Sequence, residues 1–359
     1  MGLDVRNPTA RGIGLAACAA ALFGATAPLL KSASRDVDAL AAAAFLYLGA
    51  GTFALGARAW RSRARREAAL TRSDVPRVLL VAVLGGIAGP ALLVHGLATT
   101  NAIRASLLLT LEAPFTVILA AAFFGEHVSR RVWFAATFIT AGAALLARPG
   151  PGAAGAGAVP GGATLGDLFV GLACLAWALD NTVSRGLADR DPLAVVAAKG
   201  LVGGALSLAV TALVHPASIQ PGAVARLLLL GAMGYGLSLQ LYLRAQRVVG
   251  AARTASVFAT APFVGVVVAV LAGAPWPGLG LAVSAGLMAV GIWLHVTERH
   301  RHAHTHLPIE HDHAHQHDDG HHGHSHEPMP VGPHAHFHRH EAVTHDHEHV
   351  EDAHHAHTH

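Results

Sequence analysis

The sequence predicts an all-α integral membrane protein of ten transmembrane helices in two inverted five-helix repeats, followed by a disordered C-terminal tail. Of its 359 residues, 53% are hydrophobic and 13% are charged, whereas about 25% of the residues in a soluble domain are charged. Apolar stretches of the length that crosses a bilayer, roughly 20 residues, recur along the chain. The lipid bilayer is therefore the first partner that the sequence implies.

Ten such stretches lie between clusters of charge. The expected spans are residues 12–31, 39–58, 78–99, 105–125, 132–148, 165–184, 192–214, 226–244, 254–273 and 277–297. The first could instead be a cleaved signal peptide ending at "ATAP", but its apolar run continues to Leu30, which is longer than a typical signal sequence. We therefore expect it to stay in the membrane.

Arginine placement predicts the orientation. With the N-terminus inside, cytoplasmic segments hold 18 of the 25 Lys and Arg residues, and the outer connections hold five. Because this asymmetry of short loops sets the orientation, both termini are expected to be cytoplasmic.

An internal repeat divides the chain. "LEAPFTVILAAAFFGEHVSRRVWFAATFITAGAALL" from Leu111 aligns with "ATAPFVGVVVAVLAGAPWPGLGLAVSAGLMAVGIWL" from Ala259, so that Pro114 falls on Pro262. Shared Ala, Gly and Leu composition is the alternative explanation, but the proline pair and a glycine pair keep one constant offset. An odd number of helices per repeat inverts the second copy, which is the architecture of secondary transporters. The expected domains are residues 1–150, 151–298 and a tail at 299–359.

Two motifs carry a resemblance to a known family. "APFTVILAAAFFGEHVS" closes the fourth span, and "GAARTASVFATAPFVG" opens the ninth. Over residues 12–297 this pattern resembles the drug/metabolite transporter superfamily, specifically its bacterial EamA-type members. The resemblance implies a ten-helix inner-membrane carrier, in many members an exporter of amino acids or other small metabolites. The chain departs from the family pattern at one point. The Gly-Glu pair after the fourth span is present as Gly125-Glu126, but the second repeat has Gly273-Ala274 in its place.

Polar side chains inside the expected spans are the candidates for a substrate or coupling cavity, because ionisable groups are costly in a bilayer. They are Glu112, Asp180, Asn181, Lys199 and Gln240. Lys199 could hold a substrate carboxylate, while Glu112 or Asp180 binds an amine or carries a coupling proton. The structural alternative is an ion pair of Asp180 with Lys199 or with Arg185.

Helix-breaking residues are the candidates for gating, since they free backbone groups that only a protein-lined or wet cavity satisfies. They are Pro28, Gly89, Pro90, Pro114 and Pro262. His95 and the two cysteines, Cys18 and Cys174, are expected to have packing roles.

The tail is a different polymer, because 23 of the 27 histidines lie in its last sixty residues. It has no apolar periodicity, which predicts disorder. Imidazole and carboxylate groups bind Zn, Ni, Co or Cu with low specificity. The candidate ligands are His300, His302, His304, His306, His311, His313, His315, His317, His321, His322, His324 and His326.

Three functions fit these observations. The first is a metabolite exporter with a metal-binding appendage and no cofactor in its body. The second is a divalent-metal exporter with the tail as collector and with Glu112, Asp180 and His95 as transient ligands. The third is a membrane-tethered metal buffer or sensor. The first function is favoured, because the membrane body offers few metal ligands and because Lys199 would repel a metal cation. No catalytic motif indicates an enzyme, the net charge of +3 gives no support for nucleic-acid binding, and a homodimer is left open.

Overall fold

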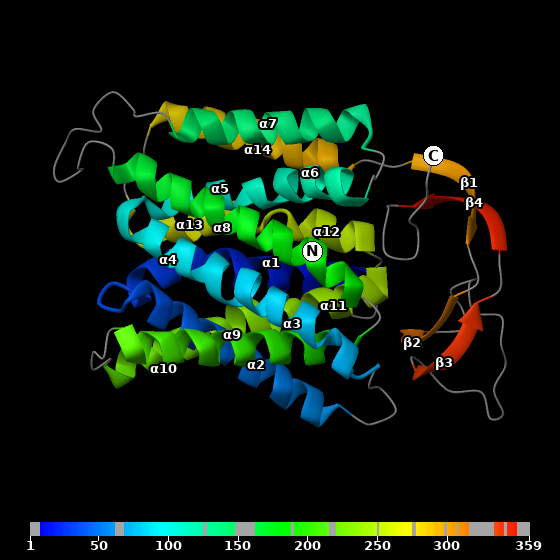
Figure 1. Ribbon diagram of the computed structural model, residues 1–359. Helices are drawn as coiled ribbons and strands as arrows, with labels where there is room; N and C mark the ends of the chain where they lie inside the picture. Colours follow the sequence, from blue (N-terminus) through cyan, green and yellow to red (C-terminus); the bar gives the residue numbers. More distant parts are fainter. Residues whose placement is uncertain are drawn as a thin grey trace.

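The computed structural model shows a bundle of helices with roughly parallel axes, joined at one end to a pair of small β-ladders (Figure 1). It describes residues 8–61, 68–124, 128–147, 162–187, 190–214, 220–249, 251–274, 278–297, 300–306, 309–315, 334–340 and 343–349. The bundle therefore holds almost all of the described chain.

The first half of the bundle contains five helical passes. Its elements are α1 (Pro8–Ala33), α2 (Ala39–Trp60), the 3-10 helix η2 (Arg72–Asp74), α3 (Val75–Val81), the π-helix η3 (Ala82–Ala88), α4 (Gly89–Thr99), α5 (Ala102–Leu108), the 3-10 helix η4 (Leu109–Leu111), α6 (Glu112–Phe124) and α7 (Arg130–Ala147).

The second half follows the same order. Its elements are α8 (Gly162–Ser184), the 3-10 helix η5 (Arg185–Leu187), α9 (Pro192–Val214), α10 (Pro221–Gly231), the π-helix η6 (Ala232–Leu237), α11 (Ser238–Val249), α12 (Ala251–Phe258), α13 (Ala261–Leu271) and α14 (Leu279–Val296).

Seven helices in the described chain are long and apolar enough to cross a membrane. The expected passes outside this group are those of α7, α8 and α12 with α13. Two arginines begin α7, two aspartates lie in α8, and α13 has only 11 residues. The membrane character predicted from the sequence is therefore confirmed for seven passes, while ten spans stay a prediction.

Irregular elements recur at equivalent places in the two halves. A π-helix interrupts the third pass of each half, at η3 and at η6. The fourth pass of each half breaks just before a proline, at η4 ahead of Pro114 and at a turn between α12 and α13 ahead of Pro262. Proline explains the second pair of breaks, because its ring removes a backbone donor and clashes with the carbonyl four residues earlier.

Contacts between the halves follow the same symmetry. Helix α2 packs on its counterpart α9, and α7 packs on its counterpart α14. The contact of α1 with α11 is matched by that of α8 with α4, and the contact of α1 with α13 by that of α8 with α6. Both halves therefore contribute to the middle of the bundle.

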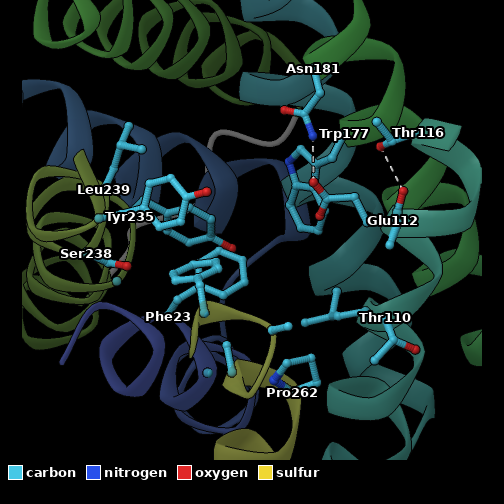
Figure 2. A pocket seen from close by; sticks show the side chains of 18 of the residues that line it. Phe23, Thr110, Glu112, Thr116, Trp177, Asn181, Tyr235, Ser238, Leu239 and Pro262 are labelled. Atoms are coloured by element: carbon cyan, nitrogen blue, oxygen red, sulfur yellow. Dashed lines mark hydrogen bonds between the residues drawn. The ribbon is translucent and has the colours of Figure 1, made fainter. Parts of the chain in front are cut away.

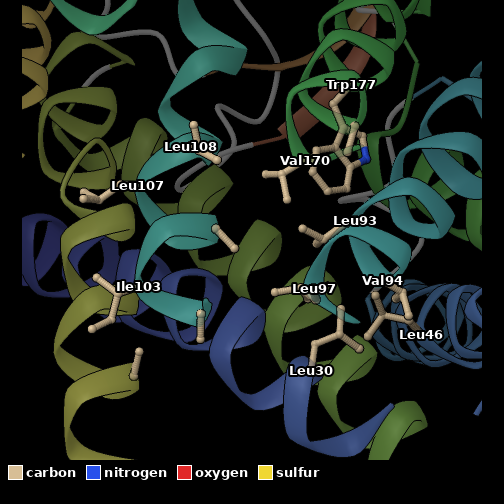
Figure 3. Packing of buried hydrophobic residues seen from close by; sticks show 14 of the residues in the cluster. Leu30, Leu46, Leu93, Val94, Leu97, Ile103, Leu107, Leu108, Val170 and Trp177 are labelled. Carbon is tan, nitrogen blue, oxygen red and sulfur yellow. The ribbon is translucent and has the colours of Figure 1, made fainter. Parts of the chain in front are cut away.

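The main buried cluster gathers apolar side chains from several helices (Figure 3). Its largest side chains include Leu30, Leu97, Ile103, Leu107 and Val170. They come from the end of α1, the end of α4, from α5 and from the first third of α8. Apolar packing thus fills the end of the bundle where α1 and α4 end and where α5 and α8 begin.

The tail contains two antiparallel ladders, whereas the sequence predicts disorder. Strand β1 (His300–His306) pairs with β4 (Val343–His349), and β2 (Ile309–His315) pairs with β3 (His334–His340). Histidine at every second residue gives these segments the period of a β-strand, which explains the difference. Seven predicted metal ligands fall on β1 and β2, while His317, His321, His322, His324 and His326 lie outside the described residues.

Candidate substrate cavity

A cavity of about 570 Å³ lies between the two halves of the bundle (Figure 2). Its walls come from α1, α2, α5, η4, α6, α8, α9, η6, α11, α12, α13 and α14. Phe23 and Tyr47 line it near the middle of their helices, whereas His295 lines it one residue before the end of α14. The cavity therefore extends from mid-bundle toward the end where α2, α11 and α14 terminate.

That end carries most of the arginines of the bundle, and we call it the arginine-rich end. Arg58 at the end of α2 pairs with Asp191 before α9, with 3.0 Å between Nε and Oδ2. Arg190 pairs with Asp74 before α3, with 2.9 Å between Nε and Oδ2. These pairs join the two halves at the arginine-rich end.

An ion pair from the second half borders the cavity. Lys199 of α9 donates to the carboxylate of Asp180 on α8, and Asp180 is only 2% exposed. The π-helix η3 packs against this pair at Gly85, where a Cβ would overlap the Asp180 carboxylate. The Gly85 carbonyl accepts a hydrogen bond from Trp177 Nε1 at 3.2 Å. Glycine allows the backbone to approach the ion pair this closely, since a Cβ at this position would force the two charged side chains to shift.

A second carboxylate reaches the cavity from the first half. Glu112 begins α6 directly after the break at η4, and its Oε1 accepts a hydrogen bond from Asn181 Nδ2 at 2.7 Å (Figure 2). Asn181 follows Asp180 on α8. The helix break and α8 therefore place Glu112 beside the Asp180–Lys199 pair without a cationic partner of its own in the described part of the chain.

Aromatic rings form the remaining wall. All three tyrosines of the chain line the cavity. The complete aromatic set is Phe23, Tyr47, Trp177, Tyr235, Tyr242 and Phe258. Neighbouring ring centroids in this set lie 5.0 to 5.7 Å apart, which is within the usual range of stabilising aromatic pairs. We call these six residues the aromatic wall.

A buried polar cluster holds the opposite end of the bundle together. Arg104 of α5 pairs with Asp167 of α8, which also accepts a hydrogen bond from the Thr100 hydroxyl. Lys31 at the end of α1 donates to the carbonyl of Thr100 at 2.7 Å and to that of Leu97. This closed-end cluster of Lys31, Thr100, Arg104 and Asp167 ties three helices of the first half to α8 of the second.

The family assignment follows from the sequence profile of the EamA-like transporter family. It matches the chain twice, over residues 10–148 and 164–297. The chain belongs to the EamA-like transporter family. It is thus a membrane transporter, and the two matches coincide with the two halves of the bundle.

Individual relatives give less detail about this EamA-like transporter. An "Uncharacterized transporter" of Methanothermobacter thermautotrophicus is 28% identical over 193 residues, which span 51% of this chain and 55% of the relative. The chain thus spans about half of the length of this curated relative. A solved structure titled "Crystal structure of protein" has a TM-score of 0.58 at 21% identity, covering 80% of this chain and 98% of that one. That similarity concerns the fold alone.

The structure brings four of the five predicted cavity residues of the EamA-like transporter together: Glu112, Asp180, Asn181 and Lys199. The fifth, Gln240, is buried in α11 and is not one of the lining residues. For Asp180, the ion pair with Lys199 that the sequence left open as a structural alternative is present.

Of the predicted gating residues, Pro262 lines the cavity, and Pro114 follows the break that positions Glu112. Gly89 and Pro90 begin α4 after the π-helix, and Pro28 is buried inside α1. Four of the five lie at or near irregular backbone, whereas Pro28 lies inside the regular helix α1.

Sequence reasoning missed the aromatic wall, His295 and Asp167. Aromatic residues in an apolar helix carry no signal of which face they occupy, so only packing separates them from lipid-facing residues. Asp167 had a detectable signal, because it is a charge within an expected span in a chain that also places Arg104 near a span end.

The hypothesis of divalent-metal transport requires a set of metal ligands. In the described part of the chain, no group of three or more His, Cys, Asp or Glu residues is placed to hold an ion. His95 is exposed on α4 and packs edge-on against Phe169, with ring centroids 4.5 Å apart. It lies outside the cavity lining.

Proposed function

We propose that this transporter is an exporter of small metabolites that works by alternating access, and that the cavity between its halves is the substrate site. The observation that carries the proposal is the asymmetry of the two ends. The cavity reaches the arginine-rich end, whereas the closed-end cluster and the apolar core fill the other. Substrate sites at the interface of inverted repeats are typical of secondary transporters.

Transport requires that the closed end open while the arginine-rich end closes. The inverted symmetry supplies a second arrangement, because helices that meet at one end have counterparts at the other. The closed-end cluster, however, has no counterpart in sequence at the arginine-rich end. Arg104 corresponds to Ala252 by the offset of the proline pair. Asp167 corresponds to Ala10 when "GLAACAAAL" from Gly14 is aligned with "GLACLAWAL" from Gly171. The conformation with the cavity reaching the arginine-rich end is therefore the resting state in this proposal.

The direction depends on the orientation. The arginine asymmetry supports an arginine-rich end, and both termini, in the cytoplasm. The resting cavity then takes substrate from the cytoplasm and releases it outside after the switch. A bacterial inner membrane is the location that fits this arrangement and the family.

The tail is a separate element in this proposal. Its histidines bind Zn, Ni, Co or Cu in the cytoplasm with low specificity, and the body transports a metabolite without a cofactor. Neutral imidazole is a good ligand for these metals. Strands β1 to β4 lie beside the arginine-rich end (Figure 1), whereas the described residues that line the cavity all lie in the helical bundle.

The test compares cells that express the full chain, a chain ending at Glu298 and neither. Each culture is loaded with nickel, cobalt or zinc, and metal and metabolite contents of cells and medium are measured. The proposal expects both chains to lower a metabolite pool in the cells and raise it in the medium. Metal efflux by the full chain that is lost on truncation would replace it with metal transport.

A further inference from the structure

The charges of the cavity define which substrate charge it accommodates. Among the described residues, its ionisable lining groups are Glu112, Asp180, Lys199 and His295, apart from the tyrosines. Asp180 and Lys199 neutralise each other. His295 lies one residue before the end of α14, at the arginine-rich end. In the described part of the chain, Glu112 forms no ion pair of its own, and its hydrogen-bond donor is the amide of Asn181.

Glu112 is placed to interact with a bound molecule. Its hydrogen-bond donor is the amide of Asn181, which is neutral, and both residues line the cavity. A carboxylate in a low-dielectric site gains most from a charged donor, since hydrogen bonds with an ionised donor and acceptor are about twice as strong as neutral ones. An ammonium group of a bound molecule would therefore be a favourable partner for the Glu112 carboxylate.

The aromatic wall favours the same ligand. Its rings are in mutual contact across α1, η6, α11 and α12. The faces of Tyr, Trp and Phe rings attract cations within about 6 Å, and clusters of such rings recognise ammonium groups. The chain already shows this geometry once, because Lys199 Nζ lies 5.9 Å from the centroid of the Tyr47 ring.

An anionic group finds no equivalent site. Lys199 is the one amine that lines the cavity among the described residues, and Asp180 already holds it. Transferring Lys199 to a substrate carboxylate would leave Asp180, which is 2% exposed, without its counter-ion. Breaking a buried ion pair in this way is strongly destabilising.

We infer that the cavity binds a small organic monocation, in which a protonated amine contacts Glu112 and an apolar or aromatic body packs on the aromatic wall. The inference rests on the proposed function only in taking this cavity as the substrate site. It narrows the substrate class from metabolites in general to amines without a carboxylate. A volume of about 570 Å³ accommodates a molecule of this kind with a ring and a short chain.

Three probes with the same phenylethyl body test the charge requirement: phenethylamine, phenylalanine and 3-phenylpropionate. Binding is measured by calorimetry on the full chain in detergent at pH 7. Phenethylamine is expected to bind at least about tenfold more tightly than phenylalanine or 3-phenylpropionate. Each of these two carries a carboxylate that finds no cationic partner among the described residues of the cavity. Equal or tighter binding of either carboxylate, or no binding of phenethylamine at 10 mM or below, would overturn the inference.

Two substitutions locate the charge. Glu112→Gln keeps the shape of the side chain and is expected to weaken phenethylamine binding by about 30-fold or more, the usual effect of removing one partner of a desolvated charge pair. Asp36→Asn removes an exposed carboxylate at the opposite end of the bundle and is expected to leave binding unchanged. Unchanged binding in Glu112→Gln would place the cation elsewhere and overturn the assignment, and the charge series on the unmodified chain tests the substrate class even if this variant does not fold.

The proposed function has a different readout. Phenethylamine is also loaded into proteoliposomes and its release is measured. Binding with the predicted selectivity but without release would support the monocation site and contradict transport through it. Release of a carboxylate metabolite that phenethylamine does not inhibit would keep the transporter function and overturn the monocation.

Discussion

Replacing Asp167 with Asn should unlock the closed end of the bundle. The substitution keeps the size of the side chain but removes the charge that Arg104 pairs with. Asp167 is 5% exposed and the Arg104 side chain 16% exposed, so the pair is largely buried. An open end would hydrate both groups, so the loss falls mainly on the closed conformation.

The size of the effect follows from this burial. Breaking a buried ion pair by removing one partner costs about 3–5 kcal/mol. The partial exposure of Arg104 lowers the expected shift below this range, to about 2–3 kcal/mol, since water screens part of the lost interaction. Each 1.4 kcal/mol is a factor of ten, so the open population should rise about 30- to 150-fold.

Thiol labelling at Ser106 measures that population. Ser106 is 1% exposed and lines the cavity one turn from Ala102, to whose carbonyl it donates. In a background of Cys18→Ser and Cys174→Ser, Ser106→Cys reacts with a membrane-impermeant maleimide added on the Lys31 side only when the closed end opens. Adding Asp167→Asn should raise the labelling rate about 30-fold or more, whereas Asp36→Asn should leave it unchanged.

A charge swap tests whether the pair itself is responsible. Arg104→Asp combined with Asp167→Arg restores opposite charges and should bring the labelling rate back toward that of the parent. Labelling that stays slow in Asp167→Asn would refute the assignment of the closed-end cluster as a lock. Fast labelling in both the single variant and the swap would indicate general loosening of α5 and α8 instead.

Three further outcomes are expected. Glu112→Gln and Lys199→Ala should each abolish transport in export assays, because the first removes the unpaired carboxylate and the second leaves Asp180 unpaired; full activity in both would remove the site assignment. Gly85→Ala should destabilise the protein by about 1–3 kcal/mol in thermal unfolding, since its Cβ overlaps the Asp180 carboxylate, while Gly171→Ala, which has open space, should not. Ending the chain at Glu298 should remove most bound nickel or zinc in dialysis, and the full chain should lose metal as the pH falls through about 6.5, because only neutral imidazole is a ligand; pH-independent binding would contradict this.

The hydropathy and the charge distribution were sufficient to predict the helical membrane body. Lipid disfavours charged side chains and unpaired backbone groups, so spanning segments are apolar and helical. The proline pair at Pro114 and Pro262 predicted the repeat, and the structure breaks both helices just before these residues. The π-helices η3 and η6 were not predicted, since an extra residue in one helical turn leaves no clear mark in a glycine-rich apolar segment.

The ionisable residues of the candidate site could be predicted from the sequence, whereas the aromatic wall could not. Glu112, Asp180 and Lys199 stand out because ionisable residues are rare in membrane helices. Which of them pair is decided by tertiary packing: α8 and α9 bring Asp180 to Lys199, and α6 brings Glu112 to Asn181. The alternation of histidines in the tail has the period of a strand, yet its polarity and lack of a core predicted disorder.

The most direct test of the central claim is a comparison of metabolite pools in cells that express the unmodified chain, Glu112→Gln or neither, with mass spectrometry of cells and medium. If the cavity between the halves is the transport site, the unmodified chain lowers one or more small amines inside and raises them outside, and Glu112→Gln at equal membrane abundance matches the control without transporter. Equal export by the unmodified chain and by Glu112→Gln would contradict the account.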